Sequence, residues 1–286
     1  MKIGFIGAGI MGHGMAANLL KAGHGLTVIA NRNRTPIEDL VSKGAVEARS
    51  YKELAENKVA IILCVTNSAI ADKVIDQLVP HLNANVLVID TTTNEPEAPL
   101  RLAKKVTSVG ARYVEAPVTG GAKQAAEGIL GAIVACEEDH FPEAKSLLLS
   151  FCKQAEHFGP VGTAAKTKLV SNFLALGTAT LVVETFKQAR SLGVDWRKLY
   201  ELAQLGSGNS SAMHRIVGNA LKGDFQGYVF TNENSLKDLS YIHSLLEQEG
   251  LDVSLAATMK TLYAEAVEQG DGKRMISERL ATSEKE

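Results

Sequence analysis

Residues 2–12 read Lys-Ile-Gly-Phe-Ile-Gly-Ala-Gly-Ile-Met-Gly, and this stretch decides the fold. A short apolar run leads directly into three glycines, Gly7, Gly9 and Gly12, and a helical pattern follows at once. Strand, glycines and helix in that order predict the first turn of a dinucleotide-binding βαβ unit. Gly7 would make the tight turn, Gly9 would let the backbone approach a pyrophosphate, and Gly12 would let the helix pack on the strand.

The residues around and beyond this turn indicate which cofactor binds. The turn includes Ile10 and Met11, and it would place the pyrophosphate at a helix N-terminus, where free N–H groups and the helix dipole favour negative charge. About 20 residues further on, a carboxylate would bind the ribose hydroxyls of NAD. The chain instead has Asn31, Arg32 and Arg34 there. Because arginine pairs well with phosphate, we expect NADP as the cofactor, with NAD possible.

The first half of the chain has the pattern of an α/β domain. Its apolar runs are rich in β-branched residues and alternate with stretches of helical spacing, which predicts a Rossmann-type, doubly wound and mainly parallel sheet. All seven prolines lie in the first 160 residues. We therefore place a cofactor-binding domain at residues 1–162. After the first run, the predicted strands are 26–30, 59–65, 86–90, 112–115 and 130–136.

The second half has only helical patterns. Residues 163–192 contain no proline, and their apolar positions follow the 3.6-residue period of one long helix that joins the two domains. We expect residues 163–286 to form an all-α domain that contributes to substrate binding and oligomerisation. The further helical patterns cover 196–204, 211–221, 234–249 and 253–269.

Composition excludes several classes of function. A net charge of -2 over 286 residues gives no strong field for nucleic acid or an anionic membrane, and the longest apolar runs are too short to cross a bilayer. The N-terminus lacks the pattern of a secretory signal, so we expect a cytoplasmic protein. The three cysteines and seven histidines have no metal-ligand spacing, so we expect no metal. These features favour a small molecule as the partner of this protein.

Three segments combine hydroxyl, amine and small residues in a way that packing alone does not explain. Residues 90–96 follow a predicted strand, where open α/β sheets place their ligand crevice. Residues 115–121 end in a hydroxyl and two glycines, whose N–H groups can bind a carboxylate. Residues 159–162 precede Lys168 and Asn172, which lie four apart and so on one face of the long helix.

With the glycine turn and Lys237-Asp238-Leu239, these segments resemble the β-hydroxyacid dehydrogenase family, in order from residue 1 to about residue 250. That family includes 3-hydroxyisobutyrate and tartronate semialdehyde dehydrogenases. The resemblance implies hydride transfer between a nicotinamide cofactor and a small 3-hydroxy acid or its semialdehyde. It also implies a homodimer or homotetramer. It leaves open which acid is used, such as a hydroxypropionate, glycerate or β-hydroxy amino acid type, and which direction dominates.

The resemblance also assigns roles to residues. Lys168 would be the catalytic general acid and base, with Asn172 beside it orienting the substrate. An amine can take the hydroxyl proton as the hydride leaves, and burial would lower its pKa. The substrate carboxylate would be held by Thr119, Gly120 and Gly121. The cofactor site would include Gly7, Gly9, Ile10, Met11, Gly12, Asn31, Arg32, Arg34, Val65, Thr66, Thr93 and Lys237.

Some positions depart from the family pattern. Thr92 and Thr119 stand where serines are usual, and Glu115 stands where Asp is usual. Three alternatives share the scaffold: a phosphogluconate-type dehydrogenase, an imine reductase and a non-catalytic cofactor-binding module. Phosphogluconate dehydrogenases usually have His at the position of Ser171, and imine reductases generally lack the lysine, so Lys168 favours a hydroxyl or carbonyl substrate.

Overall fold

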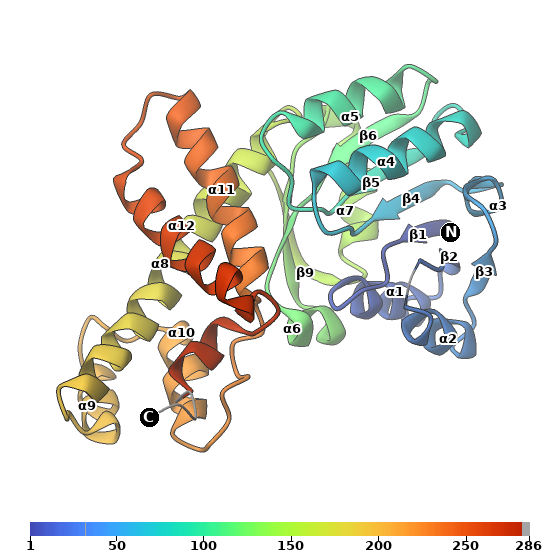
Figure 1. Ribbon diagram of the computed structural model, residues 1–286. Coiled ribbons are helices and arrows are strands. Elements are labelled where there is room, and N and C mark those ends of the chain that lie inside the picture. Colours follow the sequence, from blue (N-terminus) through green and yellow to red (C-terminus); the bar gives the residue numbers. More distant parts are fainter. Residues whose placement is uncertain (32, 282–286) are drawn as a thin grey trace. The chain divides into compact units, whose positions relative to one another are not determined.

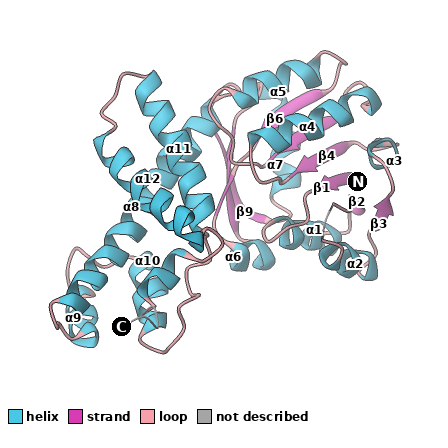
Figure 2. Ribbon diagram, in the orientation of Figure 1, coloured by secondary structure: helices cyan, strands magenta, loops and turns pink. Residues whose placement is uncertain are grey.

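The computed structural model describes residues 1–31 and 33–281. These residues form two compact units that divide between Lys168 and Leu169 (Figure 1). The division lies inside helix α8 (Thr163–Ser191), which the sequence analysis assigned as a whole to the second domain. Every strand of the described residues belongs to the first unit, and Figure 2 shows the second as helices and loops. The predicted fold class, a Rossmann-type sheet followed by helices, is confirmed.

The main sheet of the first unit has six parallel strands in the order β3-β2-β1-β4-β5-β6. Chain order reverses between β1 and β4, so the crevice for a ligand is expected beyond the carboxyl ends of these two strands. The strands are β1 (Lys2–Ile6), β2 (Gly25–Ile29), β3 (Val46–Ala48), β4 (Ala60–Leu63), β5 (Leu87–Asp90) and β6 (Arg112–Glu115).

Successive side chains of these strands enter two separate cores, because side chains alternate between the faces of a sheet. On β1, Ile3 and Phe5 enter one core, and Ile6 enters the other. Helices α1 (Gly12–Lys21), α2 (Thr35–Ser42) and α7 (Phe141–Leu148) supply buried residues to the first core. Helices α3 (Tyr51–Ala55), α4 (Ser68–Leu78) and α5 (Ala98–Thr107) supply the second. The sheet is thus buried on both faces, as its continuous apolar runs predict.

A second, three-stranded sheet corrects one prediction. The run at 130–136 does form a strand, β8 (Leu130–Val134), but it lies outside the main sheet, between β7 (Val118–Thr119) and β9 (Cys152–His157). Pro117 follows β6 and has no N–H to continue a ladder. The chain therefore turns there, and β7 pairs with β8 in the antiparallel direction. Helix α6 (Ala122–Glu127) connects the two strands.

The second unit packs its helices around one core that includes Leu176, Val183 and Tyr263. Besides α8, it contains α9 (Trp196–Ala203), α10 (Ser211–Met213), α11 (Asn232–Gln248) and α12 (Ser254–Ala266). The helices predicted at 211–221 and 253–269 are present, but the α-helical part of each is shorter than predicted. Each passes into a π-helical turn, His214–Gly218 and Val267–Asp271. Short 3₁₀ turns cover Val79–His81, Glu138–His140 and Ile276–Leu280.

Helix α8 is long and apolar enough to cross a membrane by length and composition alone. Core helices of soluble proteins pass the same test, so this is weak evidence for a span. Leu169, Leu176, Val183 and Phe186 on this helix are buried in the core of the second unit. The packing accounts for the apolar character of that face.

Candidate functional site

The glycine turn between β1 and α1 has the conformation that its three glycines require. Gly7 has a φ of +97°, and a Cβ there would overlap the carbonyl oxygen of Cys64. A Cβ on Gly12 would overlap the carbonyl oxygen of Gly7, so α1 starts in close contact with the turn. A Cβ on Gly9, in contrast, would meet nothing within 4 Å. The space beside Gly9 is open to a ligand.

Backbone donors of the turn also fit an anion. The N–H of Gly9 donates to the carbonyl oxygen of Gly7 at 2.9 Å, whereas the N–H groups of Ile10 and Met11 have no acceptor among the described residues. No side chain caps α1, and its first turn contains no acidic residue. Free N–H groups and the positive end of the helix dipole therefore point to a pyrophosphate at this place. The residues present fit the phosphates of a dinucleotide.

The segment after β2 carries the residues predicted to select NADP. Asn31 is exposed, and Arg32 lies outside the described residues. The guanidinium of Arg34 donates to Glu47 on β3 at 3.0 Å and lies 3.5 Å from Glu38. These carboxylates raise the pKa of Arg34, so its charge is permanent. Its side chain is 55% exposed, and solvent weakens exposed ion pairs, so a phosphate can compete with these carboxylates for the guanidinium.

Residues after β4 and β5 meet at the same edge of the sheet. Val65 and Thr66 follow β4, and the N–H of Val65 donates to Oγ1 of Thr92 at 3.2 Å. Thr93 is half-buried in the loop that follows β5. Parallel strands place their carboxyl ends at one edge, so the glycine turn, Val65, Thr66 and Thr93 lie along the predicted cofactor crevice.

Asp90, to which the sequence analysis gave no role of its own, fixes the loop after β5 through hydrogen bonds. Its Oδ1 accepts the N–H of Thr92 at 2.9 Å. Its Oδ2 accepts the amide of Asn94 at 2.8 Å and the hydroxyl of Tyr113 at 3.1 Å. Complete burial raises the pKa of Asp90 above its usual value. A buried, fully bonded carboxyl thus fixes the backbone that carries Thr93.

The segment predicted to bind a carboxylate follows β6 and Pro117. Thr119 is half-buried, and its Oγ1 lies 3.5 Å from the carbonyl oxygen of Gly131, which is a weak hydrogen bond. Gly120 has a φ of +114°. The N–H of Gly121 donates to Oε1 of Gln124 at 3.0 Å. A carboxylate bound here could accept a hydrogen bond from the Thr119 hydroxyl, whose present bond is weak. It would compete with Gln124 for the N–H of Gly121.

Helix α8 carries the two residues predicted to do the chemistry. Lys168 is 8% exposed and is the last residue of the first unit. Asn172 belongs to the second unit, and its amide nitrogen donates to Oδ2 of Asp238 on α11 at 2.6 Å. Lys237, beside Asp238, forms an ion pair with its Oδ1 at 3.0 Å. The buried Asp238 therefore fixes the Asn172 amide, whose second N–H can donate to a ligand.

Each unit assembles its own share of the predicted site. In the first unit, the ends of parallel strands carry the glycine turn, Val65, Thr66 and Thr93. In the second unit, Asn172 and Lys237 both bind the carboxylate of Asp238. The sequence analysis included Asp90, Glu115 and Asp238 in its motifs but gave them no role, and the structure shows all three as buried carboxylates. Acidic residues at the ends of apolar strands were the available signal for Asp90 and Glu115.

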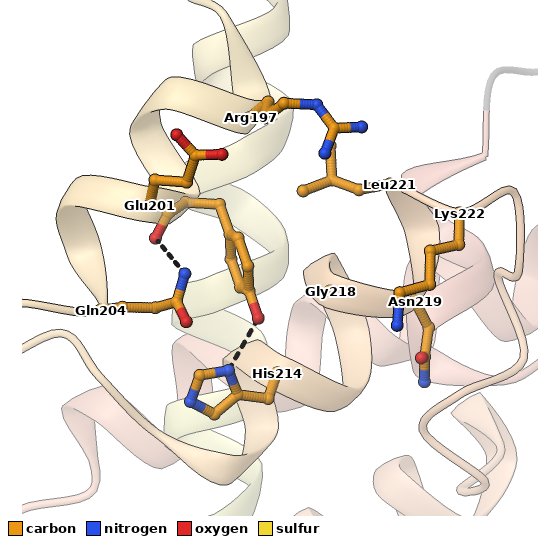
Figure 3. Close-up of a pocket in the computed structure, with 9 residues that line it drawn as sticks. Arg197, Glu201, Gln204, His214, Gly218, Asn219, Leu221 and Lys222 are labelled. Atoms are coloured by element: carbon orange, nitrogen blue, oxygen red, sulfur yellow. Dashed lines mark hydrogen bonds between the residues drawn. The ribbon is translucent and has the colours of Figure 1, made fainter.

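A hollow of about 420 Å³ lies elsewhere in the second unit (Figure 3). The hydroxyl of Tyr200 lies 2.7 Å from Nδ1 of His214 on its wall. Its lining mixes cations with Glu201 and contains none of the predicted site residues, so we assign it no function. The residues that line it are Arg197, Tyr200, Glu201, Gln204, His214, Gly218, Asn219, Leu221 and Lys222.

Comparison with known proteins covers both units. Residues 2–159 match the family model described as the NAD binding domain of 6-phosphogluconate dehydrogenase. Residues 162–281 match the model described as NAD-binding of NADP-dependent 3-hydroxyisobutyrate dehydrogenase. The two models meet near the start of α8 and together account for most of the chain.

Individual relatives agree with these matches. The mitochondrial 3-hydroxyisobutyrate dehydrogenase of Drosophila melanogaster is 28% identical over 96% of this chain and 87% of its own length. The solved structure of Psf3 in complex with NADP+ and 2-OPP has a TM-score of 0.87 at 26% identity, covering 98% of this chain and 99% of the other. An imine reductase from Pseudomonas sp. has a TM-score of 0.67 at 22% identity, covering 97% of each chain, and shares the fold alone.

Proposed function

Because this chain belongs to the β-hydroxyacid dehydrogenase family, we propose that it transfers a hydride between NADP and a small 3-hydroxy acid or the matching semialdehyde. The observation that carries this proposal is a lysine, Lys168, that is almost fully buried on α8. Lysine is almost never buried to this extent unless it is paired, and buried lysines are the ones that proteins use as general bases. Four residues further along the helix, Asn172 is fixed by a buried carboxylate.

The reaction requires that a proton and a hydride leave the substrate together. The cofactor, when bound, supplies the hydride acceptor of the oxidation. Lys168, as the neutral amine, would take the hydroxyl proton while the carbinol carbon becomes a carbonyl, and as the ammonium it would return the proton in reduction. The second N–H of the Asn172 amide would donate to the substrate oxygen and so orient it, while Lys168 takes the hydroxyl proton. Burial excludes water from the amine and strengthens these interactions.

The remaining predicted residues would bind the two molecules. Thr119 with the backbone of Gly120 and Gly121 would hold the substrate carboxylate. Arg34 would leave Glu47 for the 2′-phosphate of NADP, which offers a stronger, charge-assisted partner than an exposed carboxylate. The glycine turn, Val65, Thr66, Thr93 and Lys237 would bind the rest of the cofactor.

The first test compares three proteins in one assay. The wild type, Lys168→Ala and Lys166→Ala would be assayed for NADP and NAD reduction with a panel of 3-hydroxy acids, and for NADPH oxidation with semialdehydes and cyclic imines. Lys166 is the matched control, since it is exposed on the same helix two residues earlier. We expect NADP-linked oxidation that falls by about 100-fold or more in Lys168→Ala alone.

Other outcomes decide between the alternatives. Turnover of imines without turnover of hydroxy acids would replace the proposal by an imine reductase. Turnover of a phosphorylated sugar acid alone would point to a phosphogluconate-type enzyme. Cofactor binding without any turnover would favour a binding module.

We also propose that the protein is a homo-oligomer whose subunits pack through α8. Val170, Leu174 and Leu181 are 62%, 75% and 69% exposed on this helix, on the side away from its buried residues. Large apolar side chains at this spacing form a stripe that a second copy of the helix can cover. Light scattering of the wild type would give the subunit number.

A further inference from the structure

Glu115 lies where three structural elements of the first unit meet. It ends β6, in register with Asp90 of β5. Its backbone also exchanges two hydrogen bonds with Ala135, just past β8, at 3.0 and 2.8 Å. Its side chain is 1% exposed. Both sheets therefore hold the backbone of this residue, and its carboxyl has little freedom to move.

The Glu115 carboxyl binds the start of α8. The N–H of Gly162 donates to Oε2 at 2.7 Å, and the N–H groups of Ala164 and Ala165 lie close enough to this carboxyl to lower its pKa. The first N–H groups of a helix have no partner inside the helix, and buried ones need an acceptor. Gly162, which precedes the helix with a φ of +98°, has no side chain to supply one. Glu115 thus does for α8 what an N-cap side chain does for other helices.

The turn that Glu115 binds is the one on which Lys168 depends. Lys168 follows in the second turn, and in an α-helix its N–H pairs with the carbonyl of Ala164. Helical side chains lean toward the N-terminus, so that of Lys168 covers the first turn. Fraying or rotation of this turn would move the amine relative to the sheet, and a misplacement of about 1 Å can cost 100-fold in rate.

We propose that Glu115 is a positioning residue of the proposed dehydrogenase, which holds the first turn of α8 and thereby sets the place of Lys168. The expected effect on rate rests on the proposed function, because it assumes that Lys168 is catalytic. The binding of the first turn of α8 by Glu115 does not depend on that function. No carboxylate is needed simply to accept these N–H groups, because a glutamine oxygen would do so. The charge of Glu115 is the property that distinguishes it.

That charge changes near neutral pH. Burial raises the pKa of Glu115 to about 7. The backbone N–H groups at the start of α8 lower this pKa and Asp90 raises it, but both effects are weaker than that of burial. Above this pH the carboxylate makes charge-assisted bonds to a helix N-terminus, which are stronger than those of the neutral acid. The titratable groups on the elements packed around it are Asp90 on β5, Tyr113 on β6, Cys136 after β8, His157 on β9, and Lys166 and Lys168 on α8.

The test uses Glu115→Gln and Glu115→Ala in the full chain, with Asp90→Asn as the matched control. Asp90 is also a buried carboxyl at the end of a strand, but its hydrogen bonds come from Thr92, Asn94 and Tyr113 and not from α8. Hydrogen exchange of the amides at 163–167 would be followed by mass spectrometry without cofactor. We expect exchange to increase by about tenfold or more in Glu115→Ala, and to stay near the wild type in Glu115→Gln and Asp90→Asn.

Kinetics test the consequence for Lys168. The ratio of kcat between wild type and Glu115→Gln compares the two proteins at each pH. We expect this ratio to rise by about threefold from pH 6 to pH 8, in oxidation and in reduction alike. In Glu115→Ala, kcat should fall by about tenfold or more while the KM for NADP stays unchanged, because the glycine turn is on another strand.

The possible failures are distinguishable. Unchanged exchange in Glu115→Ala would overturn the inference whatever the activity. Increased exchange with an unchanged kcat and a flat pH ratio would also overturn it, since the turn would then not control Lys168. If Glu115→Ala does not fold, the pH ratio of Glu115→Gln decides alone. An inactive wild type would refute the proposed function, while the exchange experiment would still judge the binding of α8 by Glu115.

Discussion

Substitution by alanine should change the stability of the fold in opposite directions at two glycines of the turn after β1, Gly9 and Gly12. Gly9→Ala adds a methyl group into open space at a residue whose φ is not positive, so the folded chain accepts it. Losing a glycine also restricts the unfolded chain, which stabilises the fold by about 0.4–1 kcal/mol. Gly12→Ala instead drives a methyl group into the carbonyl oxygen of Gly7 and against Phe5. The backbone cannot yield there cheaply, and overpacking of this kind costs about 1–3 kcal/mol.

The affinity for the cofactor should instead fall more in Gly9→Ala, which is the more stable of the two variants. The methyl group of Gly9→Ala occupies the space through which a pyrophosphate would approach the backbone. Overpacking by about 1–3 kcal/mol corresponds to about 5- to 150-fold weaker binding. Any weakening in Gly12→Ala should instead accompany the loss of the fold, with a Tm lower by about 2–12 °C.

Two measurements on purified protein check this pair. Thermal unfolding would be followed by circular dichroism, and NADPH binding by its fluorescence below the unfolding range. The expected result is a stable Gly9→Ala protein that binds poorly and a less stable Gly12→Ala protein. If Gly9→Ala binds NADPH as tightly as the wild type, the pyrophosphate does not lie on this turn and the assignment of the cofactor site is wrong.

Three further predictions follow from the described contacts. Arg34→Ala should raise the KM for NADP by about tenfold, through loss of a charge-assisted bond, and leave the KM for NAD unchanged; equal effects on both cofactors would contradict the role of Arg34. Glu115 keeps its proton up to about pH 7 in the folded chain against 4.5 in the unfolded chain. Burying the charged form therefore costs more than its stronger hydrogen bonds to α8 gain, so the stability of the fold is complete below about pH 4.5 and falls as the pH rises through 7. Urea unfolding should show Glu115→Gln gaining up to about 3 kcal/mol relative to the wild type between pH 5 and pH 8, and a constant difference would refute this. Leu174→Glu should lower the mass seen by light scattering, since a carboxylate cannot be buried without a partner, whereas Lys166→Ala should not change it.

Five of the six strands of the main sheet were predictable because they are mainly apolar runs with no competing period. β3 and β7 were not predicted, since three and two residues give no periodic signal. β9 was missed because four of its six residues are polar or charged, as expected for a strand with an exposed face. The strand at 130–136 was found but placed in the wrong sheet, because the turn at Pro117 sets its partner and local sequence does not.

The same limit applies to the site. The glycine turn and the Lys168–Asn172 pair are local patterns, and sequence spacing predicts them. Their supporting carboxylates are distant, since Asn172 and Asp238 are 66 residues apart and Gly162 and Glu115 are 47 apart. A single sequence contains no signal for such pairs, because the fold alone brings them together.

The continuity of α8 across the division between the units limits how this protein can be rearranged. The helix passes from Lys168 to Leu169 without a linker, so a cut there would leave four unpaired N–H groups and four unpaired carbonyls on the new ends. It would also separate Lys168 from Asn172. A gene encoding the first unit alone would therefore keep the amine on a frayed end. Exchange of either half with another protein, by recombination or by design, would have to join inside the loop before Thr163 and carry the whole helix with the second half.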